Sequence, residues 1–319
     1  MTAPTPGSLR VNGATLHYEV RGRGPLLLLI PGGTGGAASF DGIADDLAAE
    51  YTVVTYDPRG MSRSTLDDPE AEQHVAEHAD DAFRILELLS PGEPARVFGA
   101  SSGAIVALHL LATHPERIER LVAHEPPVVE VLPDARDHRA LIARVQETFR
   151  TQGLMPAMAV FAAGLKKDDA APVEPKAETE AEGEAEIELP PQAAARARQT
   201  MADLPYFVGR IVPSFMSYTP DIHRLAALSD RLVLACGQDS HGELPYRPAA
   251  FLAEHLGTEL LHFPGGHTGL TTHPAEFAAL LQTTVRCPMA DTAAGKRGRP
   301  VGTGGVQRCA DTDPGPHRR

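Results

Sequence analysis

A serine flanked by glycines marks the point where an apolar segment gives way to an alanine-rich one. The segment is Gly99-Ala-Ser-Ser-Gly103, a GxSxG sequence. When such a serine joins a strand to a helix, the tight turn lifts its hydroxyl clear of the sheet. The helix N-terminus then points at the reacting atoms and favours developing negative charge. We therefore predict that Ser101 is a nucleophile and that the backbone N–H of Ser102 stabilises an oxyanion. Ser102 is the weaker candidate for the nucleophile because it lacks glycines at both corresponding positions.

A histidine after the last apolar stretch of the sequence is a suitable base for this serine. His267 lies in the glycine-rich segment Phe263-Pro-Gly-Gly-His-Thr-Gly269, directly after the apolar stretch 259–263. A loop at the end of a strand has few packing roles, so a histidine there is available for proton transfer. We therefore predict that His267 removes the proton of Ser101.

Two carboxylates are candidates for the group that orients His267. Asp239 follows an apolar strand and a glycine, and Glu125 follows the apolar stretch 121–123. Both would lie at the end of a strand, where the serine and the histidine are also expected. The chain order Ser, Asp, His and the strand–Gly-x-Asp pattern favour Asp239. Glu125 is the alternative acid, and Asp239 would then only cap the following turn.

A second glycine-rich segment can supply the other oxyanion donor. The segment Pro31-Gly-Gly-Thr-Gly-Gly36 follows the apolar stretch 26–30 and can present backbone N–H groups freely. We predict that Gly33 donates one of them to the oxyanion. The segment does not end in Gly-Lys-Ser/Thr, so we expect no phosphate-binding loop of the nucleotide-binding type.

Apolar stretches and amphipathic segments alternate along most of the chain. Residues 26–30 are continuously apolar, as in a strand buried on both faces, whereas residues 71–90 have apolar side chains at helical spacing. This alternation predicts an α/β fold with a mostly parallel central sheet and helices on both faces. Functional residues of such sheets lie at the carboxyl ends of the strands. We predict strands at 14–20, 26–30, 51–56, 96–98, 121–123, 232–235 and 259–263, and helices at 38–50, 71–90, 104–112, 246–256 and 274–285.

A long segment without buried-strand patterns interrupts the alternation. We predict that residues 1–126 and 229–287 form the two parts of the α/β core, and that residues 127–228 form a helical cap inserted over the carboxyl ends of the sheet. Residues 168–188 are rich in acidic side chains and indicate a solvated loop. Residues 288–319 are rich in Gly, Pro and Arg and indicate a disordered tail.

The composition disfavours nucleic acid and membranes as partners. The net charge of -13 disfavours nucleic-acid binding, which needs Lys and Arg against the phosphates. The three cysteines have no metal or redox spacing and fit a reducing compartment. We see neither a signal peptide nor a membrane-length apolar stretch, so we expect a cytoplasmic protein that does not bind membranes. The oligomeric state is not predictable from the sequence.

Two short motifs suggest other functions and are not favoured. His74-Val-Ala-Glu-His78 matches a zinc-protease pattern, but the apolar face of its helix should leave the histidines towards solvent. Lys296-Arg-Gly-Arg-Pro300 resembles a single minor-groove-binding motif within the low-complexity tail. We therefore expect no metal and no cofactor, and a DNA-associated role through the tail is only an alternative.

Taken together, these motifs resemble those of the bacterial α/β-hydrolase superfamily that cleaves esters and lactones. Besides the segments that carry the serine, the carboxylate and the histidine, Tyr56-Asp-Pro-Arg-Gly-Met-Ser-Arg-Ser64 and His124-Glu-Pro-Pro127 are similar to the family, and the likeness extends over nearly the whole chain. The resemblance implies an α/β-hydrolase fold, and structural roles for Asp57 and Arg59. Many members have His-Gly at the oxyanion loop, where this sequence has Pro31-Gly32.

We interpret the chain as a serine hydrolase that cleaves an ester, lactone or related acyl bond. Its substrate would be small to medium-sized and apolar if the cap side chains line a pocket, although they would equally suit the core of the cap. Those side chains are Met155, Met158, Phe161, Tyr206, Phe207, Phe215, Met216 and Tyr218. The same triad would also serve carbon–carbon bond hydrolysis, a lyase or a perhydrolase, and the fold would also serve a ligand-binding module with little turnover.

Overall fold

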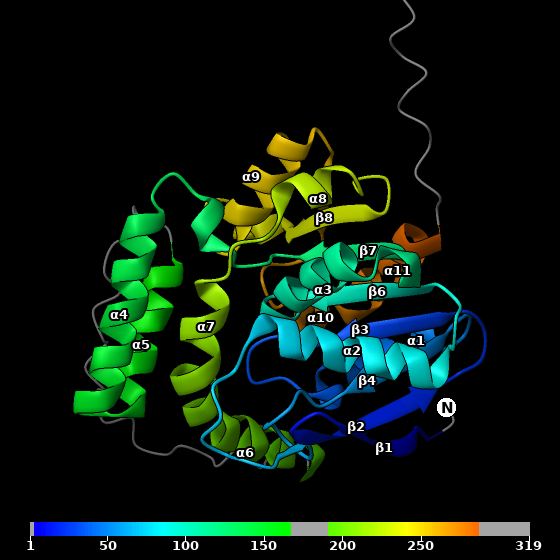
Figure 1. Ribbon diagram of the computed structural model, residues 1–319, viewed down its shortest axis with the longest axis horizontal. Helices are drawn as coiled ribbons and strands as arrows, with labels where there is room; N and C mark the ends of the chain where they lie inside the picture. The colour runs from blue at the N-terminus through cyan, green and yellow to red at the C-terminus, as the bar shows by residue number, and fades with distance from the viewer. Residues whose placement is uncertain (1–2, 167–190, 287–319) are drawn as a thin grey trace, which may run out of the picture. The chain divides into compact units, whose positions relative to one another are not determined.

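A nine-stranded sheet forms the centre of the computed structural model, which describes residues 3–166 and 191–286 (Figure 1). The strand order is β1-β2-β4-β3-β6-β7-β8-β9, and β5 pairs with β2. The pairs made by β1, β2 and β5 are antiparallel, and all pairs from β4 to β9 are parallel. The strands are β1 (Thr5–Val11), β2 (Ala14–Arg21), β3 (Leu26–Ile30), β4 (Thr52–Tyr56), β5 (Thr65–Leu66), β6 (Ala95–Ala100), β7 (Ile118–His124), β8 (Leu232–Gly237) and β9 (Leu260–Phe263).

The predicted α/β fold class is confirmed by this arrangement. Every residue of β3 is buried, as its continuous apolar sequence indicates. Strand β1 was not predicted. It is an edge strand with mostly exposed residues, and it contains Pro6 and Gly7, which weaken a strand pattern in the sequence.

Helices cover both faces of the sheet (Figure 1). On one face, α2 (Val75–Leu89), α3 (Ser102–Thr113) and α9 (Tyr246–Leu256) share a hydrophobic cluster with the strands. On the other face, α1 (Asp41–Leu47) and α11 (Pro274–Arg286) contribute to a second cluster. Because both faces are covered, the central strands are shielded from water and fix the positions of the loops at their carboxyl ends.

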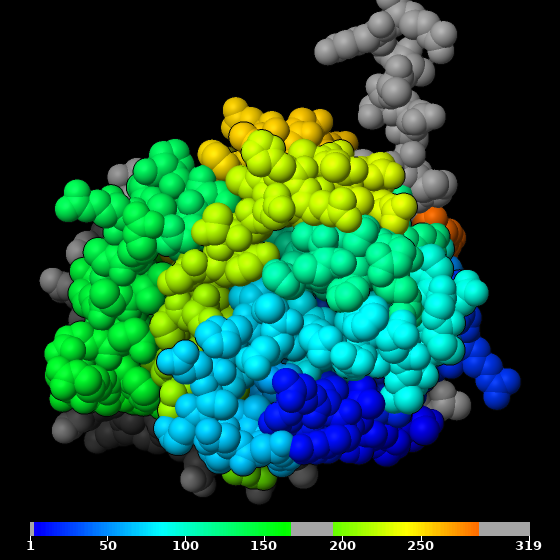
Figure 2. Space-filling view, viewed as in Figure 1, coloured from blue at the N-terminus to red at the C-terminus, as the bar shows by residue number. Residues whose placement is uncertain are grey.

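Helices also fill most of the described part of the segment between β7 and β8. They are α4 (Ala135–Gln152), α5 (Leu154–Leu165), α6 (Pro191–Tyr206), α7 (Val212–Met216) and α8 (Ile222–Ala226), and a π-helical turn, Phe207–Ile211, joins α6 to α7. Figure 2 shows the α4 and α5 residues in green, gathered at one side of the molecule beside the yellow-green residues that follow α6. Apolar residues of α4, α5 and α7 share a third hydrophobic cluster, so these helices have a core of their own.

Two of the predicted segments lie outside the described residues. The acidic run 168–188 falls within residues 167–190, and the tail 288–319 follows residue 286. The cap boundaries at 127 and 228 stay a prediction. Within residues 3–166 and 191–286, no helix has the length and apolar character that a membrane span requires.

Candidate active site

Ser101 occupies a strained turn between β6 and α3. Its backbone has φ 52° and ψ -122°, a conformation that a residue with a side chain rarely adopts. The flanking glycines make the turn possible. A Cβ on Gly99 would lie 2.6 Å from the carbonyl oxygen of Gly103, and a Cβ on Gly103 would lie 2.4 Å from that of Ile30. The GxSxG sequence therefore forms the turn for which its glycines are needed.

His267 meets Ser101 from the loop between β9 and α10 (Gly269–Thr272). Its Nε2 lies 3.2 Å from Oγ of Ser101, within reach for proton transfer. The two residues are 166 positions apart in sequence, and the parallel order of β6 to β9 brings their loops to the same edge of the sheet.

The carboxylate beside His267 belongs to Glu125, and the preference for Asp239 is therefore wrong. Nδ1 of His267 lies 2.5 Å from Oε2 of Glu125, whose other oxygen accepts a hydrogen bond from the backbone N–H of Gly237 at 2.9 Å. Asp239 is exposed in the turn after β8, and its backbone N–H donates to the carbonyl oxygen of Gly265 at 3.0 Å. Among the described residues, His267 has no hydrogen bond to Asp239.

The backbone explains why Glu125, and not Asp239, reaches the histidine. Glu125 comes directly after β7, the strand beside β6, and its φ of 48° turns the side chain away from the strand direction into the site. Its side chain is fully buried. In contrast, the chain after β8 passes through Gly237 and Gln238 before it reaches Asp239, by which point it is on the surface.

The surroundings of Glu125 favour its charged form. Burial alone raises the pKa of this carboxyl, but the hydrogen bonds from His267 and from the Gly237 N–H lower the pKa below its usual range. An ionised carboxylate can only accept hydrogen bonds, so Nδ1 of His267 must carry the proton. Nε2 is then free to accept the proton of Ser101.

A second histidine, His124, directly precedes Glu125 at the end of β7 and is neutral. Burial lowers the pKa of His124 to about 4. Its ring is fully buried and packs against Phe98, Phe263 and Phe277. Neither ring nitrogen has a hydrogen-bond partner among the described residues. His124 therefore acts as an apolar filler that supports the end of β7.

The glycine-rich segment 31–36 lies close to Ser101, and the Gly33 N–H has a partner that the sequence does not predict. A Cβ on Gly32 would lie 2.7 Å from Cβ of Ser101, so glycine is required for this close approach. The Gly33 N–H donates to the side-chain hydroxyl of Ser102 at 3.0 Å. The expectation that this N–H is free for a substrate is therefore corrected. The N–H of Ser102 lies in the first turn of α3, where N–H groups have no partner within the helix.

An apolar cavity of about 490 Å³ adjoins Ser101 and His267. Four of the side chains that the sequence suggests as a pocket lining adjoin it: Phe161, Phe207, Phe215 and Met216. The other lining side chains with apolar character include Leu165, Ile211, Val212 and Leu270. Met155 is instead 64% exposed. The Tyr206 hydroxyl is hydrogen-bonded to the carbonyl oxygen of Arg59, and the Tyr218 hydroxyl is hydrogen-bonded to Nδ1 of His109. The helices between β7 and β8 therefore contribute both to the lining of the cavity and to a hydrophobic cluster of their own.

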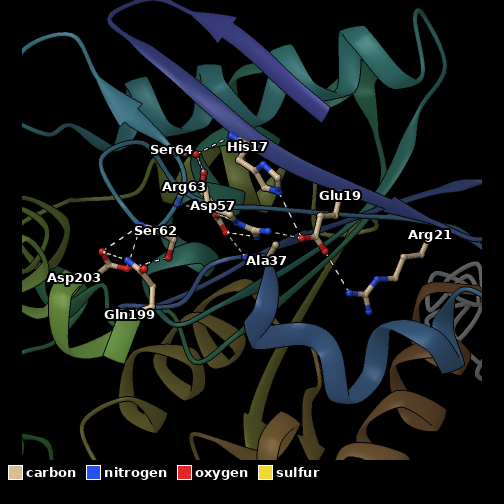
Figure 3. Close-up of polar contacts among 10 residues, drawn as sticks. All are labelled: His17, Glu19, Arg21, Ala37, Asp57, Ser62, Arg63, Ser64, Gln199 and Asp203. Carbon is tan, nitrogen blue, oxygen red and sulfur yellow. Dashed lines mark hydrogen bonds and ion pairs between the residues drawn. The ribbon is translucent and has the colours of Figure 1, made fainter. Parts of the chain in front are cut away.

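A more polar cavity of about 480 Å³ adjoins the first one. Thr34, Gly35, Ser39 and Thr200 line both. Figure 3 shows the network beside it, in which Asp57 accepts from the Ala37 N–H at 2.8 Å and from Nε of Arg63 at 2.7 Å, and Arg63 also donates to Glu19 at 2.7 Å.

A separate group of hydrogen bonds, made by the residue before Arg63, connects α6 to the core. Asp203, on α6, accepts hydrogen bonds from the backbone N–H and the hydroxyl of Ser62 at 3.1 and 2.9 Å (Figure 3). Gln199, one turn earlier, donates to the same carboxylate at 3.1 Å. Because Ser62 lies in the loop after β4, these bonds hold α6 in place where it lines the second cavity.

The HxxEH segment has a structural role. His74 precedes α2 and is exposed, but His78 is buried and its Nε2 lies 3.1 Å from Oε1 of Gln73. The expectation that both histidines face solvent was therefore wrong for His78. Burial lowers the pKa of His78 to about 3. No group of three or more metal-ligating side chains occurs in the described parts of the chain.

Known proteins are similar to this chain in sequence and in fold. The family model for the alpha/beta hydrolase fold matches residues 25–163. The "Uncharacterized hydrolase YraK" of Bacillus subtilis (strain 168) is 36% identical over 280 residues, which are 86% of this chain and 94% of that protein. The chain belongs to the α/β-hydrolase family. This hydrolase is also 27% identical over 282 residues to a "Zearalenone hydrolase" of Cladophialophora bantiana, covering 87% of this chain and 95% of that one.

Solved structures support the same fold for this hydrolase. "Est816 as an N-Acyl homoserine lactone degrading enzyme" matches with a TM-score of 0.64 at 19% identity, covering 88% of this chain and all of the other. The enol-lactonase from Burkholderia xenovorans LB400 matches with a TM-score of 0.64 at 17% identity and the same coverage. At these identities the likeness supports the fold alone.

Proposed function

We propose that this hydrolase cleaves an ester or lactone through Ser101, His267 and Glu125. The observation that carries the proposal is a continuous chain of two hydrogen bonds, from the Ser101 hydroxyl to Nε2 of His267 at 3.2 Å and from Nδ1 to Glu125 at 2.5 Å. A nucleophile, a base and a group that orients the base are the three components of acyl transfer to serine.

The reaction proceeds in two steps. His267 takes the proton of Ser101 while the serine oxygen bonds to the substrate carbonyl carbon, and the carbonyl oxygen becomes an oxyanion. The imidazolium then gives its proton to the departing alkoxide as the carbon–oxygen bond breaks, leaving an acyl group on Ser101. In the second step, His267 takes a proton from water, the hydroxide attacks the acyl group, and the acid leaves as Ser101 regains its proton. Glu125 keeps its negative charge throughout and stabilises the imidazolium.

The lining of the cavity supports an apolar acyl or ring portion in the substrate. Phe161, Phe207, Phe215 and Met216 from the cap face the same space as Ser101. A cavity of about 490 Å³ suits a small to medium-sized molecule. The relative from Cladophialophora bantiana is named for zearalenone, so we include that compound among the test substrates.

The test compares the wild type with Ser101→Ala on short-chain p-nitrophenyl esters, simple lactones and zearalenone. We expect the variant to lose nearly all turnover, because loss of the nucleophile removes the acyl-enzyme route. Ser90→Ala, at the far end of α2, is the matched control and should behave as the wild type. Equal rates for wild type and Ser101→Ala would refute the proposal. Analysis of the products as acid plus alcohol would separate ester hydrolysis from carbon–carbon cleavage or perhydrolysis.

A further inference from the structure

The side-chain hydroxyl of Ser102 has an unusual position beside the nucleophile. Its oxygen accepts the hydrogen bond from the Gly33 N–H at 3.0 Å, across the gap between the oxyanion loop and α3. Ser102, Ser101 and Gly33 all line the apolar cavity. A hydroxyl has one hydrogen to donate as well as lone pairs to accept with. Within residues 3–166 and 191–286, no acceptor takes the hydrogen of the Ser102 hydroxyl.

We propose that the Ser102 hydroxyl is a catalytic donor to the oxyanion. The proposal rests on the acyl-transfer function proposed above. In this arrangement Ser102 supplies two donors, its backbone N–H and its side-chain O–H, and Gly33 holds the side chain in place. The Gly33 N–H thus acts on the oxyanion through Ser102, which differs from the direct role expected from the sequence.

Physical chemistry favours this use of the hydroxyl. The hydrogen bond from Gly33 fixes the oxygen of Ser102 before the substrate arrives, so little reorganisation is needed when negative charge develops. A hydroxyl that already accepts a hydrogen bond is also polarised and becomes a better donor. Finally, the first turn of α3 adds the positive end of the helix dipole to the same region.

The contacts of the neighbouring residues argue against a nucleophilic role for Ser102. His267 forms its hydrogen bond with Oγ of Ser101, and only Ser101 has the strained backbone of the turn. The competing interpretation is that the Ser102 hydroxyl occupies the place of the oxyanion and must rotate away before catalysis. The two interpretations predict opposite effects when the hydroxyl is removed, so one variant distinguishes them.

The experiment measures kcat and KM of the full-length wild type and Ser102→Ala with p-nitrophenyl butyrate. Loss of one oxyanion donor should lower kcat by roughly 100-fold, with KM changed by less than about threefold. Ser102→Thr retains a hydroxyl and should recover most of the lost kcat. Thr113→Val removes a hydroxyl at the opposite end of α3 and is the control for general effects on that helix.

Inhibition by an aryl trifluoromethyl ketone provides a readout that loss of helix stability would not change. Ser101 adds to this ketone and generates a bound oxyanion, so Ser102→Ala should weaken inhibition by about the same factor as it lowers kcat. Unchanged or increased kcat in Ser102→Ala would overturn the proposal, as would a lower kcat with unchanged ketone affinity. Failure of the proposed function itself has a different signature, namely Ser101→Ala as active as the wild type.

Discussion

Exchange of Glu125 for glutamine is the sharpest perturbation of the site. The carboxylate is fully buried and holds two hydrogen bonds, one from the Gly237 N–H at 2.9 Å and one from Nδ1 of His267 at 2.5 Å. Glutamine has nearly the same shape, and its amide oxygen can still accept the bond from Gly237. Its amide nitrogen would then face Nδ1 and donate to it. The imidazole would shift its proton to Nε2, where it could no longer accept the proton of Ser101.

The expected cost follows from the change of tautomer and the loss of charge. A carboxylate-to-amide exchange in a Ser-His-Asp triad lowers kcat by roughly 10,000-fold, or about 5.5 kcal/mol of transition-state stabilisation. We expect a loss of this order for Glu125→Gln. Steady-state turnover of a p-nitrophenyl ester measures it, with circular dichroism to confirm the fold.

Asp239→Asn is the matched control for this exchange. The Asp239 side chain is exposed, and its backbone N–H, which contacts Gly265, is unaffected by the substitution. We expect kcat to stay within about threefold of the wild type. The reasoning would be refuted if Asp239→Asn lost activity while Glu125→Gln kept it, because Asp239 would then orient the histidine in the working enzyme.

Three further predictions concern stability and the cap. The pKa of Glu125 is lower in the folded protein than its usual value of 4.5, so its charge stabilises the fold above about pH 4.5, and this stabilisation is lost as pH falls through the lower folded pKa. The difference in unfolding free energy between the wild type and Glu125→Gln should therefore be constant near neutral pH and change only in acid. A change confined to pH 6–8 would contradict this. Asp203→Ala removes the hydrogen bonds that α6 makes with Ser62. It should lower the free energy of unfolding, measured by urea titration, by about 1–3 kcal/mol, and it should raise KM more than it lowers kcat. An unchanged KM would show that the cap needs no such connection. Gly99→Ala places a Cβ 2.6 Å from the Gly103 carbonyl oxygen. It should lower the free energy of unfolding by about 1–3 kcal/mol and abolish turnover. Full activity would mean that the turn adapts more easily than its contacts imply.

Ser101 and His267, which the sequence predicts and the structure brings within hydrogen-bond distance, are both marked by local constraints. Ser101 lies in a turn of a few residues that requires glycines, because a side chain would not fit there. His267 lies in a glycine-rich loop after a strand. The parallel sheet follows from continuous apolar stretches such as β3. In each case the information lies within about ten residues, so one sequence is sufficient.

The parts that could not be predicted depend on contacts between distant segments. Glu125 and Asp239 both follow buried strands, and only the φ of 48° at Glu125 turns one of them into the site. In the sequence, the signal for Glu125 is its place directly after a strand and before two prolines, and the strand–Gly-x-Asp pattern at Asp239 is the stronger signal. His78 was expected to face solvent, but it lies buried 4.9 Å from the ring centre of Phe215, a residue 137 positions away.

The hydrogen bond from Gly33 to Ser102 was also beyond the sequence. Both residues were predicted to serve the oxyanion through their backbone N–H groups, which are present whatever the side chain. Whether the Ser102 side chain intercepts the Gly33 N–H depends on the distance between two segments 69 positions apart. Only the folded chain fixes that distance.

Covalent labelling of the nucleophile tests the central claim most directly. The full-length protein is incubated with a fluorophosphonate, which bonds to an activated serine, and the labelled peptide is sequenced by mass spectrometry. We predict one adduct per chain on Ser101, absent in Ser101→Ala and much slower in Glu125→Gln. An adduct on Ser102 or another residue, or ester turnover by a protein that resists labelling, would contradict the account.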